Sequence, residues 1–153
     1  MNNSEKDRLC QLKDEQTNST IINSLLRYYS EKGITAKITK NNDKYGCWDF
    51  KIELDGVEWY CESKERNYFS YSFATDFFER KKLNEMRKIS NNILYFASFN
   101  KDKMILVYDL RKVNGGKIAV INTEKYTMDS SRGTVDKQFL ELDKKSAILK
   151  LKW

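Results

Sequence analysis

The sequence predicts a single α/β (α+β) domain, in which a helix is followed by a three-stranded antiparallel meander, a second helix and further strands of a mixed sheet. Three observations predict this order. Residues 17–32 carry an apolar arc at helical spacing, two alternating runs meet at Asp55-Gly56, and residues 93–99 are apolar on both parities. The chain has 153 residues, of which 40% are hydrophobic, and this is enough to bury one core without disulfides or metals.

The first helix is expected over residues 17–32, because its apolar side chains recur at helical spacing and Gly33 supplies a stop. The preceding residues 1–16 are polar, and we expect them to be only partly ordered. Residues 34–40 alternate as a short strand. Residues 41–43, Asn-Asn-Asp, then turn the chain.

The hairpin expected over residues 47–64 has the strongest local signal in the chain. Asp55-Gly56 is typical of a two-residue turn that needs positive φ at both central positions. In such a hairpin the numbers of directly opposed residues sum to a constant, so the register predicts that Asp49 faces Glu62.

The opposed carboxylates of Asp49 and Glu62 need compensation. With their Cβ atoms roughly 5 Å apart and an effective dielectric of about 20, they repel by roughly 3 kcal/mol. A bound divalent cation would compensate, since Mg²⁺ favours one or two carboxylates, keeps several waters and recruits substrate phosphates. The alternative is that both acids are solvated and screened by neighbouring lysines. The pair Glu53 and Glu58 on the same face, which nothing marks as a metal site, shows that opposed acids alone do not decide this.

An Asp on one strand followed by Glu-x-Lys on the next, here Asp49 and Glu62-Ser63-Lys64, resembles the core signature of the PD-(D/E)XK nuclease superfamily. The similarity covers roughly residues 17–113. The nominal Pro of the motif, which is commonly missing in the family, is absent here.

The resemblance implies a restriction-endonuclease-like core over residues 17–113, with residues 114–153 as a C-terminal extension. It also implies that Asp49, Glu62 and the backbone carbonyl of Ser63 hold Mg²⁺, for which Mn²⁺ can substitute. Lys64 would then lie beside the attacking water and the scissile phosphate.

The segment after the Glu-x-Lys strand, residues 65–72, is polar and aromatic and leaves directly from the expected site. Its Arg66 is a candidate for holding a neighbouring phosphate. Its aromatic side chains either stack on bases or cover the edge of the core. Thr75 or Asp76 is expected to cap a second helix that runs to about Ser90.

Three further residues are weaker candidates for the active site: Glu79, Lys82 and Glu15. At 100° per residue, Glu79 and Lys82 fall on the arc of the second helix that faces the sheet, and in the resembled superfamily this helix often sends polar side chains to the active site. An i, i+3 salt bridge with outward stems is the alternative. Some members of the superfamily also place a metal-side acid near the start of the first helix. Glu15 could take that part if the helix begins early, and it is otherwise a solvated surface acid.

The rest of the chain predicts further strands. Residues 93–99 are expected to be covered on two faces, and residues 104–110 to follow as the next strand. A short strand is expected over residues 118–121. The final AILKLKW suits an edge strand.

The amino-acid composition excludes several kinds of catalytic and metal site. The chain has no histidine, which excludes imidazole bases and His-metal sites. The three cysteines, Cys10, Cys47 and Cys61, form no C-x-x-C pair, which argues against a disulfide framework and a zinc site. The net charge of +6 favours nucleic acid as the partner.

No apolar run has the length of a membrane span and the N-terminus has no signal-peptide core, so we expect no membrane partner and a cytoplasmic protein of a bacterial or phage-infected host cell.

These inferences favour a Mg²⁺-dependent nuclease that hydrolyses phosphodiester bonds, expected to be an endonuclease acting on DNA. The small size and basic charge resemble junction-resolving or phage-type members of the superfamily, and many such enzymes are homodimers. The alternative is a non-catalytic nucleic-acid-binding or interaction protein, for example an inhibitor, on a degenerate nuclease fold. The nuclease and the non-catalytic protein differ in metal dependence, since binding of nucleic acid alone needs no metal.

Overall fold

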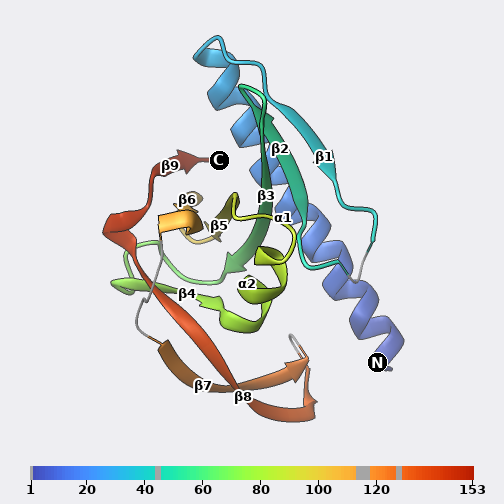
Figure 1. Cartoon of the computed structure of the whole chain (residues 1–153). Coiled ribbons are helices and arrows are strands. Elements are labelled where there is room, and N and C mark those ends of the chain that lie inside the picture. Colours follow the sequence, from blue (N-terminus) through green and yellow to red (C-terminus); the bar gives the residue numbers. More distant parts are fainter. Residues whose placement is uncertain (1, 44–45, 113–117, 127–128) are drawn as a thin grey trace.

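A six-stranded mixed sheet lies between the long helix α1 (Asn3–Glu31) on one face and the short helix α2 (Arg80–Arg87) with a second, three-stranded sheet on the other (Figure 1). The molecule therefore has three layers. This computed structural model describes residues 2–43, 46–112, 118–126 and 129–153.

The strand order shows how distant segments meet. The larger sheet has the order β1 (Lys37–Lys40), β2 (Phe50–Leu54), β3 (Val57–Arg66), β5 (Ile93–Phe99), β6 (Met104–Asp109) and β9 (Leu149–Lys152). The smaller sheet has the order β4 (Thr75–Glu79), β8 (Asp129–Asp143) and β7 (Ile118–Tyr126). Strands β3 and β5 pair in parallel, and the other pairs are antiparallel. Two short 3₁₀ turns follow β6 and β8: η1 (Leu110–Lys112) and η2 (Lys144–Ser146).

The predicted α+β fold class and its antiparallel meander are confirmed. Strands β1, β2 and β3 pair in chain order, and Ile52 lies opposite Trp59 as the hairpin register predicts. Asp55 and Gly56 both have positive φ, 50° and 78°, as the two-residue turn requires. Every residue of β5 is buried, and β9 lies at the edge of the sheet, as predicted.

The N-terminal residues differ from the prediction. Residues 1–16 are expected to be only partly ordered, but α1 already begins at Asn3. A capping box explains this start, because Asn2 and Glu5 exchange hydrogen bonds of 2.8 Å between side chain and backbone. Among the described residues, no helix is both long enough and apolar enough to cross a membrane, and this includes the long α1.

The predicted helix from Thr75 or Asp76 to Ser90 is wrong in its first part. The chain forms β4 and then the short helix α2. Asp76 does not cap a helix: it is 1% exposed and accepts a hydrogen bond of 2.6 Å from the Tyr108 hydroxyl. Phe78, two residues on, is also buried, so this segment follows the period of a strand that pairs with β8.

The C-terminal segment is also more regular than predicted. Strand β7 extends to Tyr126, beyond the expected residues 118–121, and the 15-residue β8 is not predicted at all. Because β8 is polar along most of its length, its sequence does not show the apolar alternation of a half-buried strand. The C-terminal segment thus supplies the strands β7 and β8 of the smaller sheet. It also supplies the edge strand β9 of the larger sheet.

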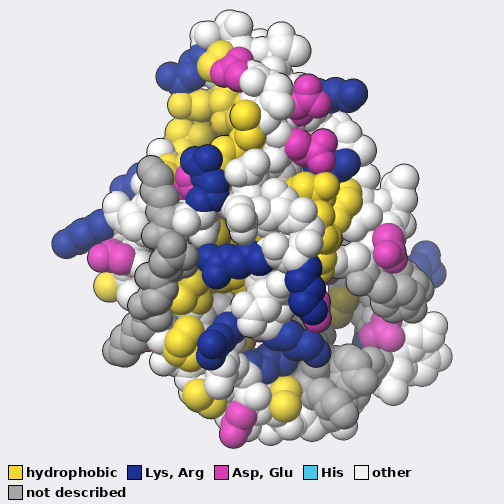
Figure 2. All heavy atoms as spheres, in the orientation of Figure 1, with side chains coloured by type: hydrophobic (Ala, Val, Ile, Leu, Met, Phe, Trp, Pro, Cys, Tyr) yellow, Lys and Arg dark blue, Asp and Glu magenta, His cyan; other side chains and the backbone are white. Residues whose placement is uncertain are grey.

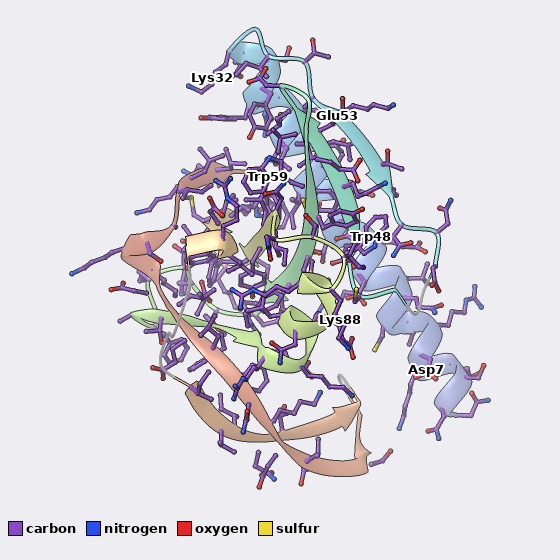
Figure 3. All side chains as sticks on the ribbon, in the orientation of Figure 1. Asp7, Lys32, Trp48, Glu53, Trp59 and Lys88 are labelled. Carbon is purple, nitrogen blue, oxygen red and sulfur yellow. The ribbon has the colours of Figure 1, made fainter. Side chains whose placement is uncertain are left out.

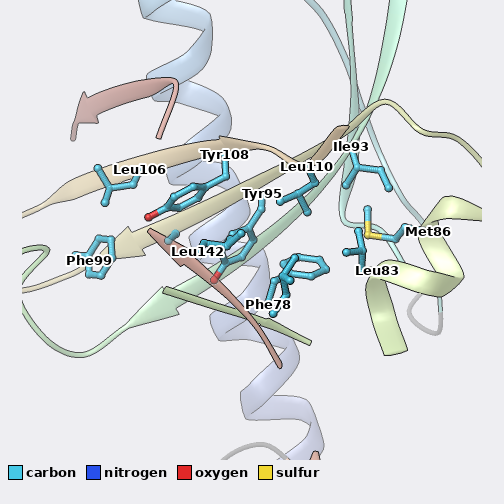
Figure 4. Close-up of a cluster of buried hydrophobic side chains, with 12 residues drawn as sticks. Phe78, Leu83, Met86, Ile93, Tyr95, Phe99, Leu106, Tyr108, Leu110 and Leu142 are labelled. Atoms are coloured by element: carbon cyan, nitrogen blue, oxygen red, sulfur yellow. The ribbon is translucent and has the colours of Figure 1, made fainter. Parts of the chain in front are cut away.

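Two apolar clusters hold the layers together. One lies between α1 and the larger sheet and includes Ile21, Leu25 and Phe50. The other lies between the two sheets and α2, where Phe78 and Tyr95 meet edge to face with ring centroids 4.9 Å apart (Figure 4). The larger sheet is therefore covered on both faces, and β3 runs through its middle.

Candidate active site

A cleft of about 410 Å³ lies along β3, between α1, α2 and the smaller sheet. Strand β3 contributes Glu62, Lys64 and Arg66, which have the same parity and so share one face of the strand. The other walls include these residues: Lys13 and Asp14 of α1, Phe77 and Glu79 of β4, Lys82 of α2, and Thr123, Lys137 and Phe139 of the smaller sheet. In Figure 2, Lys and Arg side chains gather over the middle and lower part of the face drawn.

Glu62 is the most buried acid of this cleft, with 8% of its surface exposed. Its Oε1 lies 2.5 Å from the Nζ of Lys82, and its carboxyl group is within hydrogen-bonding contact of the Asp49 carboxyl. Burial and the charge of Asp49 raise the pKa of Glu62 to about 8, although Lys82 opposes this rise. Glu62 therefore keeps a proton up to a higher pH than an exposed glutamate does.

Asp49 reaches Glu62 from just outside β2. The ladder of the hairpin ends at Phe50 opposite Cys61, and the N–H of Asp49 donates to the Cys61 carbonyl at 2.8 Å. Its Oδ2 accepts the N–H of Ser63 at 2.8 Å and lies 3.0 Å from the Ser63 hydroxyl. The same hydroxyl contacts the side chain of Asn18 on α1. Asp49 is thus oriented by β3 and, through Ser63, by α1.

Lys64 lies on the cleft face of β3, two residues beyond Glu62. Burial lowers the pKa of its amine, and the positive charge of Arg66 lowers it further. Among the residues that the structure describes, Lys64 has no hydrogen-bond or ion-pair partner. Its ammonium group is therefore available to a bound anion.

The remaining predicted residues have different surroundings. Arg66 donates to the Phe77 carbonyl at 3.0 Å and to the Tyr95 hydroxyl at 3.2 Å, so it ties β3 to both β4 and β5. Glu79 lines the cleft from the end of β4, and its Oε2 lies 3.9 Å from the Nζ of Lys137. The alternative of an i, i+3 salt bridge between Glu79 and Lys82 is not what the structure shows: Glu79 pairs with Lys137 of β8, and Lys82 pairs with Glu62 of β3.

Asp14, which the sequence did not single out, is the acid that α1 brings to the cleft. Burial raises the pKa of its carboxyl group despite the nearby charge of Lys64, and the charge of Asp49 contributes to the rise. Glu15 is exposed and does not line the cleft. The signal that could have found Asp14 is the Asn2 to Glu5 capping box, because a helix starting there places Asp14 one turn before Asn18.

A solved junction resolvase resembles this chain. It is Hjc, a Holliday junction resolvase from the archaeal hyperthermophile Archaeoglobus fulgidus, with 13% sequence identity and a TM-score of 0.45. The similarity covers 84% of this chain and 92% of that one. No protein-family model and no curated protein matches the sequence. The roles of the cleft residues therefore depend on their own geometry.

The donor atoms of the cleft suit a cation of the Mg²⁺ type. Asp49 and Glu62 bring two carboxyl groups into contact, and a divalent cation can replace the proton on Glu62. Within the described ranges, no group of three or more His, Cys, Asp or Glu side chains is arranged to hold a metal ion. Mg²⁺ needs fewer protein ligands than that, since water and phosphate complete its shell. The carbonyl of Ser63 stays a predicted ligand.

Proposed function

We propose that this protein is a divalent-metal-dependent nuclease that hydrolyses phosphodiester bonds in DNA. The observation that carries the proposal is the contact between the carboxyl groups of Asp49 and the buried Glu62 beside a cleft that is lined with lysines. Two adjoining acids at a buried position are costly unless a cation joins them, and a basic cleft attracts a polyanion. Lys64, without a partner among the described residues, supplies a further charge for a phosphate.

The residues divide the work of hydrolysis between them. Asp49 and Glu62 would hold Mg²⁺ or Mn²⁺, which when bound supplies a water of lowered pKa and neutralises charge on the phosphate. Lys64 can donate to the attacking water or to a phosphoryl oxygen, and so stabilises the charge that develops there. The N–H of Ser63, which donates to Oδ2 of Asp49 at 2.8 Å, keeps that carboxylate oriented toward the metal site.

One observation favours a second candidate function. The ammonium group of Lys82 lies 2.5 Å from Glu62, and it already supplies the positive charge that a metal ion would bring. A protein with such an internal ion pair could bind nucleic acid without cutting it. This non-catalytic candidate predicts binding that falls with salt but does not depend on metal.

The test is an assay of the full chain with supercoiled plasmid, branched DNA and RNA in Mg²⁺, Mn²⁺ or EDTA. We expect metal-dependent cleavage of DNA that is lost in Glu62→Gln and in Lys64→Met. If no substrate is cut with either metal, or if cleavage persists in Glu62→Gln, the nuclease proposal is wrong. Salt-dependent binding without cleavage would establish the second candidate instead.

A matched control lies in the same hairpin. Glu58 has the same parity on β3 as Glu62, and it opposes another acid, Glu53, directly. This pair lies near the tip of the hairpin, where Figure 3 labels Glu53, and neither acid lines the cleft. Glu58→Gln should therefore leave cleavage unchanged, and an equal loss in both variants would show that the assay reports folding and not the site.

A further inference from the structure

Two phenylalanines of the smaller sheet line the cleft without joining the core. Phe77 of β4 and Phe139 of β8 are both half-buried, with ring centroids 6.2 Å apart and an angle of 73° between the rings. Neither ring belongs to the two apolar clusters formed by the described residues. Part of each ring therefore stays accessible from the cleft.

Strand alternation explains why these rings turn away from the core. Phe78 of β4 pairs with Leu140 of β8, and both side chains are buried between the sheets. Their chain neighbours Phe77 and Phe139 must lie on the other face of the smaller sheet. Aromatic rings on that face add little to the core, but they line the same cleft as Glu62 and so belong to the candidate active site.

Cationic side chains flank the two rings. Lys137 lies two residues before Phe139 on the same face of β8, and it also lines the cleft. Arg66 donates to the carbonyl of Phe77 from the opposite wall. Flat apolar rings between cations match a nucleic-acid strand, in which bases alternate with phosphates.

We infer that Phe77 and Phe139 form a stacking site for an unpaired nucleobase, so that the substrate is a DNA strand with an unpaired nucleotide next to the scissile phosphate. The inference rests on the proposed nuclease function and adds the class of substrate. Inside a continuous duplex, neighbouring base pairs cover both faces of each base, and a base must leave the stack before an aromatic side chain can reach its face. Single strands, flaps and branch points offer such a base.

Two exposed contacts hold the smaller sheet against the helices on either side of it. The Nζ of Lys6 on α1 lies 3.0 Å from the hydroxyl of Ser131 on β8. Arg80, the first residue of α2, donates to the side chain of Gln138 on β8 at 2.8 Å. These contacts tie the smaller sheet to both helices, so the cleft is bounded on two sides.

The test measures binding separately from cleavage. The full chain is titrated in EDTA with a single-stranded DNA oligonucleotide that carries one 2-aminopurine, and with a blunt duplex of the same sequence. We expect the single strand to bind at least about tenfold more tightly than the duplex, with a change in 2-aminopurine fluorescence when the base stacks on a ring. Loss of one stacked base costs roughly fivefold to a hundredfold in affinity, so Phe139→Leu and Phe77→Leu should each weaken single-strand binding by that factor.

Two further variants separate stacking from folding. Phe139→Trp keeps an aromatic surface and should keep single-strand binding, even if Phe139→Leu unfolds the sheet. Tyr28→Leu is the matched control, because Tyr28 also belongs to a half-buried edge-to-face pair, with Tyr29 at 5.2 Å, and lies 5.0 Å from a lysine, Lys32. That pair lies at the far end of α1 from Asp14, where Figure 3 labels Lys32. Tyr28→Leu should change binding by less than about twofold, since Tyr28 packs against the cluster under α1 and does not line the cleft.

The outcomes distinguish this inference from the proposed function. If the duplex binds as tightly as the single strand, or if Phe139→Leu and Phe77→Leu bind like the wild type, the stacking site is wrong even when metal-dependent cleavage is observed. If single-strand binding needs the phenylalanines but no substrate is cut, the stacking site stands and the nuclease proposal is wrong.

Discussion

The strand pair β2–β3, which carries the acids, and the strand pair β4–β8, which carries the two phenylalanines, differ in how far apart their strands lie along the chain. In the larger sheet, β2 and β3 are joined by Asp55-Gly56, and their register follows from this turn. In the smaller sheet, Thr75 pairs with Asp143, so pairing β4 with β8 closes a long loop and costs more chain entropy. The β2–β3 hairpin brings Asp49 to Glu62, and the smaller sheet supplies the opposite wall of the cleft. The two proposals together assign the chemistry to the hairpin and substrate selection to the β4–β8 pair.

The largest expected effect tests this division of roles with one acid from each sheet. Asp49→Asn removes a charge that contacts Glu62, whereas Glu79→Gln changes an acid at the rim that lies 3.9 Å from Lys137. A metal ligand contributes several kcal/mol to the transition state. We therefore expect kcat to fall at least about a hundredfold in Asp49→Asn and less than about threefold in Glu79→Gln. Equal losses in DNA cleavage assays would place chemistry in both sheets.

The second prediction concerns the pH dependence of metal binding. The pKa of Glu62 is raised to about 8 by burial and by Asp49, so below that pH a cation must displace a proton. Affinity for Mn²⁺, measured by calorimetry, should then rise about tenfold per pH unit between pH 6 and 8 and level off above. Heats measured in buffers of different ionisation enthalpy should show release of about one proton at pH 7. A flat profile between pH 6 and 8 would mean that Glu62 does not hold the metal.

The features that the sequence predicts correctly are those specified by residues close together in the chain. The register that joins Asp49 and Glu62 depends on a two-residue turn, and the burial of β5 on an unbroken apolar run, so both signals lie within a few residues. The sequence predicts Lys82 on the sheet-facing side of a helix that it starts too early. The structure shows Lys82 in the shorter helix α2, with its Nζ 2.5 Å from Glu62, and its role stays a prediction.

The missed features depend on contacts between distant segments. Phe139 meets the cleft only because β8 pairs with β4, and nothing near Phe139 in the sequence specifies that pairing. Asp14 reaches the cleft because Thr17 and Ile21 of α1 are buried on the neighbouring face of the helix. Helical periodicity shows that α1 has an apolar side, but it does not show which polar residue at its border points at β3.

The third prediction compares neighbours on α1, which lies outside both sheets. Asp14→Asn removes a carboxyl group near Asp49 and Lys64, and Glu15→Gln changes an exposed acid that does not line the cleft. We expect the first to reduce kcat/KM about tenfold, as is typical of groups that support a metal site, and the second to have no effect. A larger loss in Glu15→Gln would mean that α1 is rotated relative to β3 when substrate is bound.

The smallest expected effect asks whether the two sheets unfold together. Gly56 in the first hairpin and Gly133 in β8 have φ of +78° and +89°, and a Cβ added at either would meet no atom within 4 Å. Backbone strain is then the main cost of Gly56→Ala and Gly133→Ala, about 1–2 kcal/mol at each position. We expect the β7–β8 hairpin to open locally before the core unfolds. Gly133→Ala should then lower the free energy of global unfolding in urea by less than half as much as Gly56→Ala does. It should also speed hydrogen exchange in β7 and β8. Equal losses would show that the smaller sheet, although specified by distant segments, unfolds as one unit with the sheet that holds the acids.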